Sequence, residues 1–310
     1  MNTKHYSYFF IIISIIALAL LIYAQKREHI STTDGKRVIC TTTIIADTVR
    51  QIAGEHLHVV SIMGPGVDPH TYKAREGDMR LLATADIIFY HGLHLEGRMA
   101  YMLDKMNQYT CTVAVTDCLD RKLLLESDTP GIYDPHIWHD ISLWQEVAEY
   151  IGKQLALCDP EHAELYTKNT LSYCATLAKL DRRIRTQINR LKPEQRILVT
   201  AHDAFSYFGR AYNFTVIGLQ GISTDAEISM HDVQNVAELT ARYKIKSLFF
   251  ESSIPERTIR AVQQAVHACN WHVNAGSELF SDSLDSPENP AGSYQGMLHY
   301  NVSHIVNDLI

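Results

Sequence analysis

The sequence predicts an α/β fold of two parallel-sheet lobes, each (βα)4-like, that one long backbone helix joins. Three observations lead to this prediction. The 310 residues are more than one hydrophobic core comfortably supports. Short β-rich runs alternate with helical patterns in both halves of the chain, as in parallel sheets covered by helices. Between the halves lies a helical segment of about 32 residues, a rod of roughly 48 Å at 1.5 Å per residue.

The composition describes an ordinary folded protein. Hydrophobic residues make up 46% and charged residues 20%, so the chain is neither disordered nor fibrous. The formal charge of −7 argues against nucleic acid as a partner, because phosphate binding needs a basic surface. Sixteen histidines favour a metal site, since imidazole is the commonest metal ligand. We expect a monomer.

Residues 1–24 have the pattern of a secretory signal peptide or of an uncleaved membrane anchor. Lys4 precedes an apolar run at 9–23. Ala24 suits the position before a cleavage site, but Ile22 is large where a small residue is expected. The stretch is nearly long enough to span a bilayer, so both forms stay open. In either form we expect an extracytoplasmic, periplasmic protein, and the uncleaved form would be anchored to the inner membrane.

The first lobe is expected at residues 36–158. Its predicted strands are the β-rich runs at 38–42, 59–63, 87–90 and 112–115. Helical patterns separate them near 45–54, 77–84 and 95–108. This alternation predicts four parallel strands with helices on both faces.

The linking helix is expected at residues 159–192. Asp159-Pro160-Glu161 supplies an N-cap, a proline at the first helical position and an acid in the first turn. Apolar residues recur three or four positions apart, as one helical face requires: Tyr173, Leu177, Leu180, Ile184, Ile188 and Leu191. We prefer a packed strut to a merely helical linker, because this stripe needs a surface to lie against.

The second lobe is expected at residues 193–310, after Pro193 ends the long helix. Its predicted strands are the runs at 197–200, 215–219, 247–251 and 271–275. The same alternation with helical stretches predicts a second parallel sheet.

Four side chains stand in loops after predicted strands, where parallel α/β sheets bind their ligands. They are His70, His136, His202 and Asp282, two from each lobe. Both first-lobe histidines belong to the tripeptide Asp-Pro-His, at 68–70 and at 134–136. Proline stiffens each loop and the aspartate can cap the local turn, which favours a preformed metal site in the cleft between the lobes.

Other polar residues receive weaker assignments. Glu251 ends a predicted strand and is a candidate to orient a ligand histidine from behind. His91 and His94 are expected to line the cleft or to lie on the surface. His139 is expected to support a ligand or to lie on the surface, with contact to the metal as a further alternative. The remaining histidines are interpreted as surface residues: His5, His29, His56, His58, His162, His231, His267, His272, His299 and His304.

The six cysteines are not expected to bind metal, because no Cys-x-x-Cys motif occurs. Cys111 and Cys118 flank a predicted strand and are the candidate disulfide pair, although we favour free thiols there. No cysteine follows the N-terminal apolar run in the context of a lipoprotein signal, so no lipid anchor is predicted.

Three neutral imidazoles and one carboxylate would hold one divalent ion with a net charge of about +1. Nitrogen ligands favour zinc by the usual affinity order, whereas a bidentate Asp282 would suit manganese; iron fits less well. Four protein ligands leave no open position for a substrate water, which favours carriage over catalysis. We expect binding to weaken as the pH falls through about 6.5.

The chain resembles the cluster A-I solute-binding proteins of zinc and manganese ABC importers, closest to the TroA type. The resemblance runs from about residue 36 to the end. It is carried by the segments at 63–70, 92–96, 134–138, 200–205, 251–255 and 279–282. It implies two α/β lobes bridged by one long helix, metal ligands at His70, His136, His202 and Asp282, and delivery of the ion to a membrane permease.

The chain departs from parts of the family pattern. The stretch 119–133 contains no histidine, so the His-rich loop of some zinc-specific relatives is missing. Manganese-specific relatives often place a glutamate where this chain has His202.

Two alternative functions stay open. A zinc-dependent hydrolase or chelatase would use Asp282 as a base beside an open metal position, and its turnover would be lost in His136→Ala. A surface adhesin would bind host matrix without metal, a role that the fold alone does not exclude.

Overall fold

The computed structural model describes residues 35–127 and 129–310, and residues 37–310 form one compact unit. The predicted signal or anchor at 1–24 lies outside the described residues. Among the helices that are described, none is both long and apolar enough to cross a membrane.

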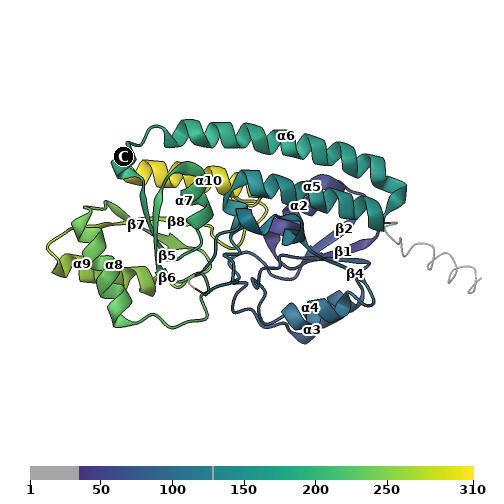
Figure 1. Ribbon diagram of the computed structural model, residues 1–310, viewed down its shortest axis with the longest axis horizontal. Coiled ribbons are helices and arrows are strands. Elements are labelled where there is room, and N and C mark those ends of the chain that lie inside the picture. The colour runs from purple at the N-terminus through teal and green to yellow at the C-terminus, as the bar shows by residue number, and fades with distance from the viewer. Residues whose placement is uncertain (1–34, 128) are drawn as a thin grey trace, which may run out of the picture. The chain divides into compact units, whose positions relative to one another are not determined.

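The first lobe is built on a four-stranded parallel sheet. Its strands are β1 Arg37–Cys40, β2 His58–Ser61, β3 Ile87–Tyr90 and β4 Cys111–Ala114, in the order β2-β1-β3-β4. The short apolar runs form strands because helices cover them, and Ile39 and Phe89 are fully buried. The helices are α2 Thr43–Ala53, α3 Glu76–Ala83 and α4 Ala100–Met106 (Figure 1). All four carboxyl ends meet at one edge of the sheet.

The predicted linking helix is present as a single long helix, which packs beside the helix that precedes it in the chain. α5 Ile141–Cys158 ends at Asp159, a 3₁₀ turn follows at Pro160–His162, and α6 Ala163–Ile188 begins. The predicted apolar stripe from Tyr173 to Ile188 is the buried face of α6, which packs on α2, α5 and α10. The helix ends at Ile188, before the predicted limit of 192, and Leu191 is buried in the turn that follows. Figure 1 shows α6 running above elements of both lobes. The long bridging helix is therefore a packed strut.

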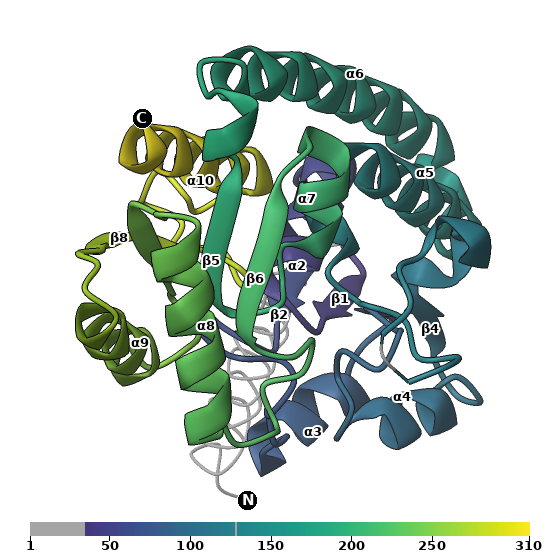
Figure 2. The same cartoon turned by 60° about the vertical axis from the view of Figure 1, so that its left-hand side comes forward.

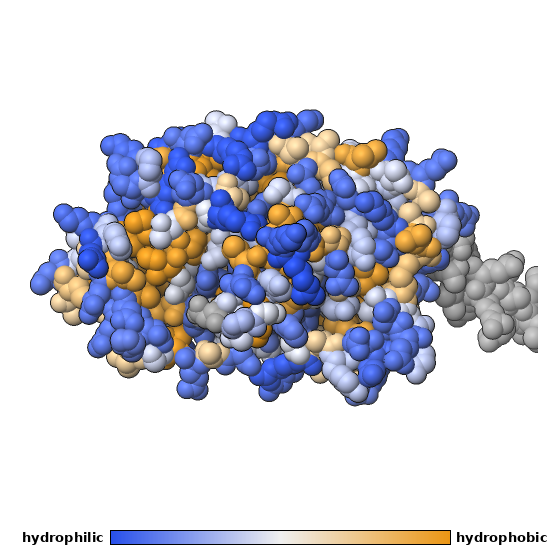
Figure 3. Space-filling model, viewed as in Figure 1, coloured by the Kyte–Doolittle hydropathy of each residue, from blue (hydrophilic) through white to orange (hydrophobic). Residues whose placement is uncertain are grey.

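The second lobe repeats the strand-helix alternation with two parallel strand pairs. β5 Ile197–His202 pairs with β6 Thr215–Gln220, and Figure 2 shows these two strands side by side. β7 Ser247–Glu251 pairs with β8 Asn274–Leu279, and β5 lies beside β7. Its helices are α7 Ser206–Tyr212, α8 Met230–Arg242, α9 Arg257–Ala268 and α10 Tyr294–Leu309. Figure 3 shows a mostly hydrophilic cover over α6 and a hydrophobic area over the strands of the second lobe.

The last strand begins later than predicted. The run at 271–275 was assigned as strand, but the amide of Trp271 donates to the carbonyl of Val266 and still closes the end of α9. Asn270 makes this possible with a left-handed backbone at φ 59°. Strand pairing starts only at Asn274, opposite Ser247.

The disulfide differs from the candidate pair of the sequence analysis. Cys111, at the start of β4, is bonded to Cys158, the last residue of α5, and Cys118 is a free thiol. Cys118 lies beyond the carboxyl end of β4, whereas Cys111 lies at the start of that strand. The end of α5 lies near the start of β4, so Cys158 is the cysteine that meets Cys111. The lobe limits at 36–158, 159–192 and 193–310 stay predictions.

Candidate metal site

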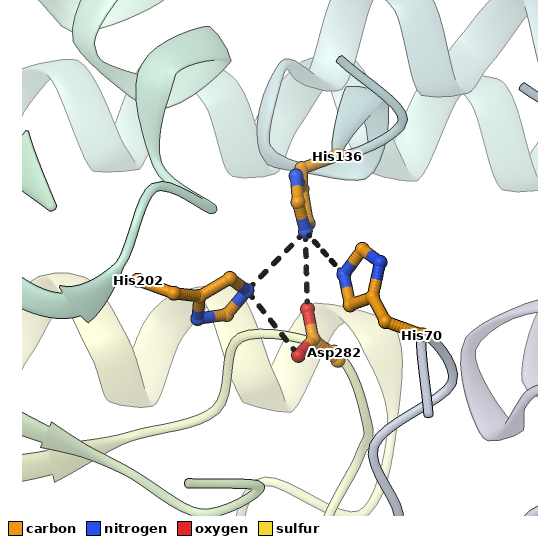
Figure 4. A group of neighbouring side chains, drawn as sticks. All are labelled: His70, His136, His202 and Asp282. Atoms are coloured by element: carbon orange, nitrogen blue, oxygen red, sulfur yellow. Dashed lines mark hydrogen bonds and ion pairs between the residues drawn. The ribbon is translucent and has the colours of Figure 1, made fainter. Parts of the chain in front are cut away.

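Four buried side chains meet between the lobes, and they are the four that the sequence predicted. The ligand atoms of His70, His136, His202 and Asp282 all lie within 4.8 Å of one another (Figure 4). We call this group the four-residue site. Each of the four residues is at most 7% exposed.

The donor atoms are spaced as ligands of one ion would be. The Nε2 atom of His136 lies 3.1 Å from His70 Nε2 and 3.4 Å from His202 Nε2. The two oxygens of Asp282 lie 3.4 Å from His136 Nε2 and 3.4 Å from His202 Nε2. Ligands at zinc distances around a tetrahedral centre are about 3.3–3.4 Å apart. These four separations are therefore close to those expected around one divalent ion, and all the ligand atoms lie within 4.8 Å of one another.

The repeated Asp-Pro-His tripeptide produces the same local turn twice. The backbone amide of His70 donates to Asp68 Oδ1 at 2.9 Å, and that of His136 donates to Asp134 Oδ1 at 2.9 Å. An aspartate that accepts from the amide two residues on closes a turn of the Asx type. The motif thus presents both imidazoles from preset backbones.

Carboxylates stand behind two of the three imidazoles. His136 Nδ1 lies 2.7 Å from Asp134 Oδ1, and His202 Nδ1 lies 2.6 Å from Glu251 Oε2. Glu251 also accepts the amide of His202 at 2.9 Å. When these rings are neutral, a carboxylate beside Nδ1 favours the proton there, which leaves both Nε2 lone pairs facing the centre. A cation bound at the centre would take the place of the second ring proton on each Nε2.

Asp282 supplies the anionic part of the site. Its Oδ2 accepts the hydroxyl of Ser253 at 3.0 Å, whereas its buried Oδ1 has no hydrogen-bond donor among the described residues. A buried carboxylate oxygen without a donor costs free energy unless a cation is bound. Both oxygens face imidazoles, so the carboxylate can bind an ion through one oxygen or two.

Burial and charge set the proton affinities of the four groups. Burial lowers the pKa of His70 to about 4. Burial acts in the same direction on His136, but Asp134 and Asp282 outweigh it and raise the pKa of His136 to about 9. Against burial, Glu251 and Asp282 hold the pKa of His202 well above its usual value. Burial opposes ionisation of Asp282, yet His202 and His136 hold its pKa well below the usual range. Protons would therefore compete with a metal ion for His136 and His202.

His139 is buried but does not join the four-residue site. Its Nε2 lies 3.1 Å from the carbonyl oxygen of Ser281, which also accepts the indole N–H of Trp138 at 2.7 Å. Both contacts join the loop of His136 to the loop of Asp282. His139 is thus a supporting residue, one of the alternatives left open above.

The sequence analysis missed a second support, made by His91 and Glu96. Buried Glu96 accepts the hydroxyl of Thr41 at 2.6 Å and the amide of His91 at 2.6 Å. His91 Nε2 lies 2.6 Å from the carbonyl oxygen of Pro135, and burial lowers the pKa of His91 to about 3. A neutral His91 therefore donates to the loop that carries His136. In the sequence, Glu96 appeared only within the segment at 92–96 that carries the family resemblance, and nothing there indicated its contacts.

Comparison with known proteins identifies the family. The sequence model described as "Zinc-uptake complex component A periplasmic" matches residues 38–308. The chain belongs to this family. "Zinc-binding protein TroA" of Treponema pallidum (strain Nichols) is 41% identical over 276 residues, 88% of this chain and 89% of the relative. "Manganese-binding lipoprotein MntA" of Bacillus subtilis (strain 168) is 40% identical over 273 residues, again 88% and 89% of the two chains.

Solved structures of the zinc-uptake family share the fold. The periplasmic zinc-binding protein TroA from Treponema pallidum matches with a TM-score of 0.87 at 40% identity, covering 89% of this chain and 99% of that chain. The predicted fold, two lobes bridged by a long helix, is confirmed. The predicted resemblance to TroA-like solute-binding proteins is confirmed as well.

Proposed function

We propose that the chain captures one divalent transition-metal ion outside the cytoplasm and delivers it to the permease of an ABC importer. His70, His136, His202 and Asp282 are the proposed ligands. The observation that carries the proposal is the convergence of three imidazole nitrogens and one carboxylate in a buried site, with carboxylates behind two of the rings. Membership of a family of solute-binding transport proteins supports it.

The ion is proposed as cargo rather than as a catalytic centre. Four protein ligands fill a tetrahedral shell and leave no position for a substrate or an attacking water. A hydrolase or chelatase would need Asp282 withdrawn from the ion, but both of its oxygens lie 3.4 Å from ligand nitrogens. Carriage is therefore favoured over the enzyme and over the adhesin.

We infer that zinc binds more tightly at equilibrium and that manganese is also accommodated, with iron less suited. Three nitrogens favour zinc over manganese by the usual affinity order. Binding through both oxygens of Asp282 would raise the coordination number, as manganese prefers. The printed names of the relatives include both a zinc-binding and a manganese-binding protein.

Metal analysis of the full-length chain tests the proposal. The unaltered chain, Asp282→Ala and His70→Ala are exposed equally to zinc and manganese, with His231→Ala as the control, because His231 is exposed on α8. One tightly held ion per chain, weakened in the two site variants and kept in the control, is expected. Tight binding that is undiminished in both site variants would contradict the ligand assignment.

A further inference from the structure

We propose that His56 and His162 form a second metal site, on the surface of the first lobe, for a zinc-like divalent ion but not for manganese. His56 lies in the loop between α2 and β2, and His162 ends the 3₁₀ turn before α6. The two rings come from distant parts of the chain. The sequence analysis interpreted both as ordinary surface residues.

The two rings are as close as rings that share an ion. Their centroids are 4.8 Å apart and their planes are inclined by 41°. In the four-residue site, the three pairs of imidazole centroids are 5.1, 5.2 and 5.8 Å apart. At this separation one ion can bind both rings when each turns its Nε2 atom toward it.

A carboxylate stands behind His162 as one stands behind His136. The Nδ1 atom of His162 lies 2.8 Å from Asp159 Oδ2, and the corresponding distance from His136 to Asp134 is 2.7 Å. Asp159 is itself buried, and its Oδ2 accepts the hydroxyl of Tyr166 at 2.6 Å. This contact places the ring proton on Nδ1 and leaves the Nε2 lone pair as the ligand. Asp159 is thus a positioning residue for the proposed site.

The second site lies at the other end of the sheet from the four-residue site. His56 comes two residues before β2, whose first residue pairs with Arg37 at the start of β1. His70 lies beyond the carboxyl end of the same strand, so the sites are separated by at least one strand length, roughly 13 Å. His56 is exposed and the side chain of His162 is 32% exposed, so an ion can reach both rings from solution.

The ligand set determines which ion is taken. Two imidazoles with water, or with the exposed neighbouring carboxylates Glu55 and Glu161, favour zinc and copper, which bind nitrogen well. Manganese prefers oxygen ligands and gains little from two exposed rings. With fewer protein ligands and no enclosure, the site should bind zinc more weakly than the four-residue site does.

The experiment isolates the second site in a full-length chain that carries His136→Ala and Asp282→Ala. Calorimetric titration with zinc at pH 7.5 should show one ion per chain, and manganese should show none. Adding His56→Ala or His162→Ala should abolish zinc binding, whereas His58→Ala, an exposed neighbour on β2, should leave it unchanged. Asp159→Asn should weaken zinc binding by about 10- to 100-fold. Thermal melting followed by circular dichroism checks that each variant is folded.

Several results would overturn this proposal. Zinc binding that is retained in the His56→Ala variant and in the His162→Ala variant would contradict the proposed site. Loss of zinc only in His272→Ala would assign it instead to His267 and His272, whose ring centroids are 4.9 Å apart. In the chain with its four-residue site intact, two zinc ions but one manganese ion are expected. Because the ligands differ, failure of one site leaves the other unaffected.

Discussion

At the scale of single residues, two carboxylates decide which imidazole nitrogens face the centre of the proposed metal site. Asp134 and Glu251 occupy the Nδ1 side of His136 and His202, so the Nε2 atoms point inward. A ring without its carboxylate can adopt the other tautomer or rotate. Metal affinity should therefore depend on residues that never touch the ion.

Glu251→Gln tests this dependence. The amide has the shape of the carboxylate but lacks its charge, so it should hold His202 less firmly and weaken zinc binding by about 10- to 100-fold. Competition against a coloured chelator measures the change. Glu256→Gln is the matched control, because Glu256 is exposed and pairs with Arg260 on α9. Equal affinities in the two variants would show that Glu251 does not orient the ligand.

The pH dependence of binding should follow the pKa values of the ligand histidines. A metal ligand must be unprotonated, and the pKa of His136 is raised to about 9 while that of His202 lies well above its usual value. His70, with a pKa of about 4, is already neutral at pH 7. Affinity should thus fall as the pH drops from 9 towards 7, by roughly tenfold per unit for each proton displaced.

This window lies above the 6.5 expected from the unperturbed histidine value. Chelator competition between pH 7 and pH 9 measures it. An affinity that is constant over that range and falls only near 6.5 would show that the carboxylates do not raise these pKa values.

At the scale of elements, α6 is held by its buried stripe. Leu177 is fully buried on that face, whereas Leu171 lies on the same helix and is 67% exposed. Leu177→Ala should lower the free energy of unfolding by about 2–5 kcal/mol, because it leaves a cavity in the core. Leu171→Ala should change it by less than about 0.5 kcal/mol. Urea unfolding measures the free energy of unfolding of both variants. Similar decreases in the two variants would mean that the stripe is not the packing face.

The elements that the sequence predicted best are those with local signals. The stripe from Tyr173 to Leu191 located α6 because helical spacing is visible in one segment. Asp-Pro-His located both proposed first-lobe ligands because the turn is closed within three residues. The bond from Cys111 to Cys158 depends on where α5 returns, which no local pattern encodes. The contact of His91 with Pro135 was equally invisible in the sequence, because the two residues are 44 positions apart and meet only in the folded structure.

At the scale of the whole of residues 37–310, the two lobes are linked directly beside the site. Asp68 holds the turn of His70 and also accepts the hydroxyl of Thr224, from the second lobe, at 2.6 Å. Arg98 pairs with Asp225 at 2.7 Å in the same loop between β6 and α8. Separation of the lobes would therefore pull on the backbone that presents one of the proposed ligands.

Thr224→Val tests whether this link restrains metal release. Valine keeps the shape and removes the hydrogen bond to a charged group, which contributes about 1.5–3 kcal/mol. If the bond breaks before the ion leaves, dissociation should become roughly tenfold faster while association changes little, as is usual for variants of one binding site. Stopped-flow mixing of the zinc-loaded chain with excess chelator measures the rate. Thr176→Val is the control, because the Thr176 hydroxyl bonds only within α6. An unchanged dissociation rate in Thr224→Val would mean that the ion leaves without separation of Asp68 from the second lobe.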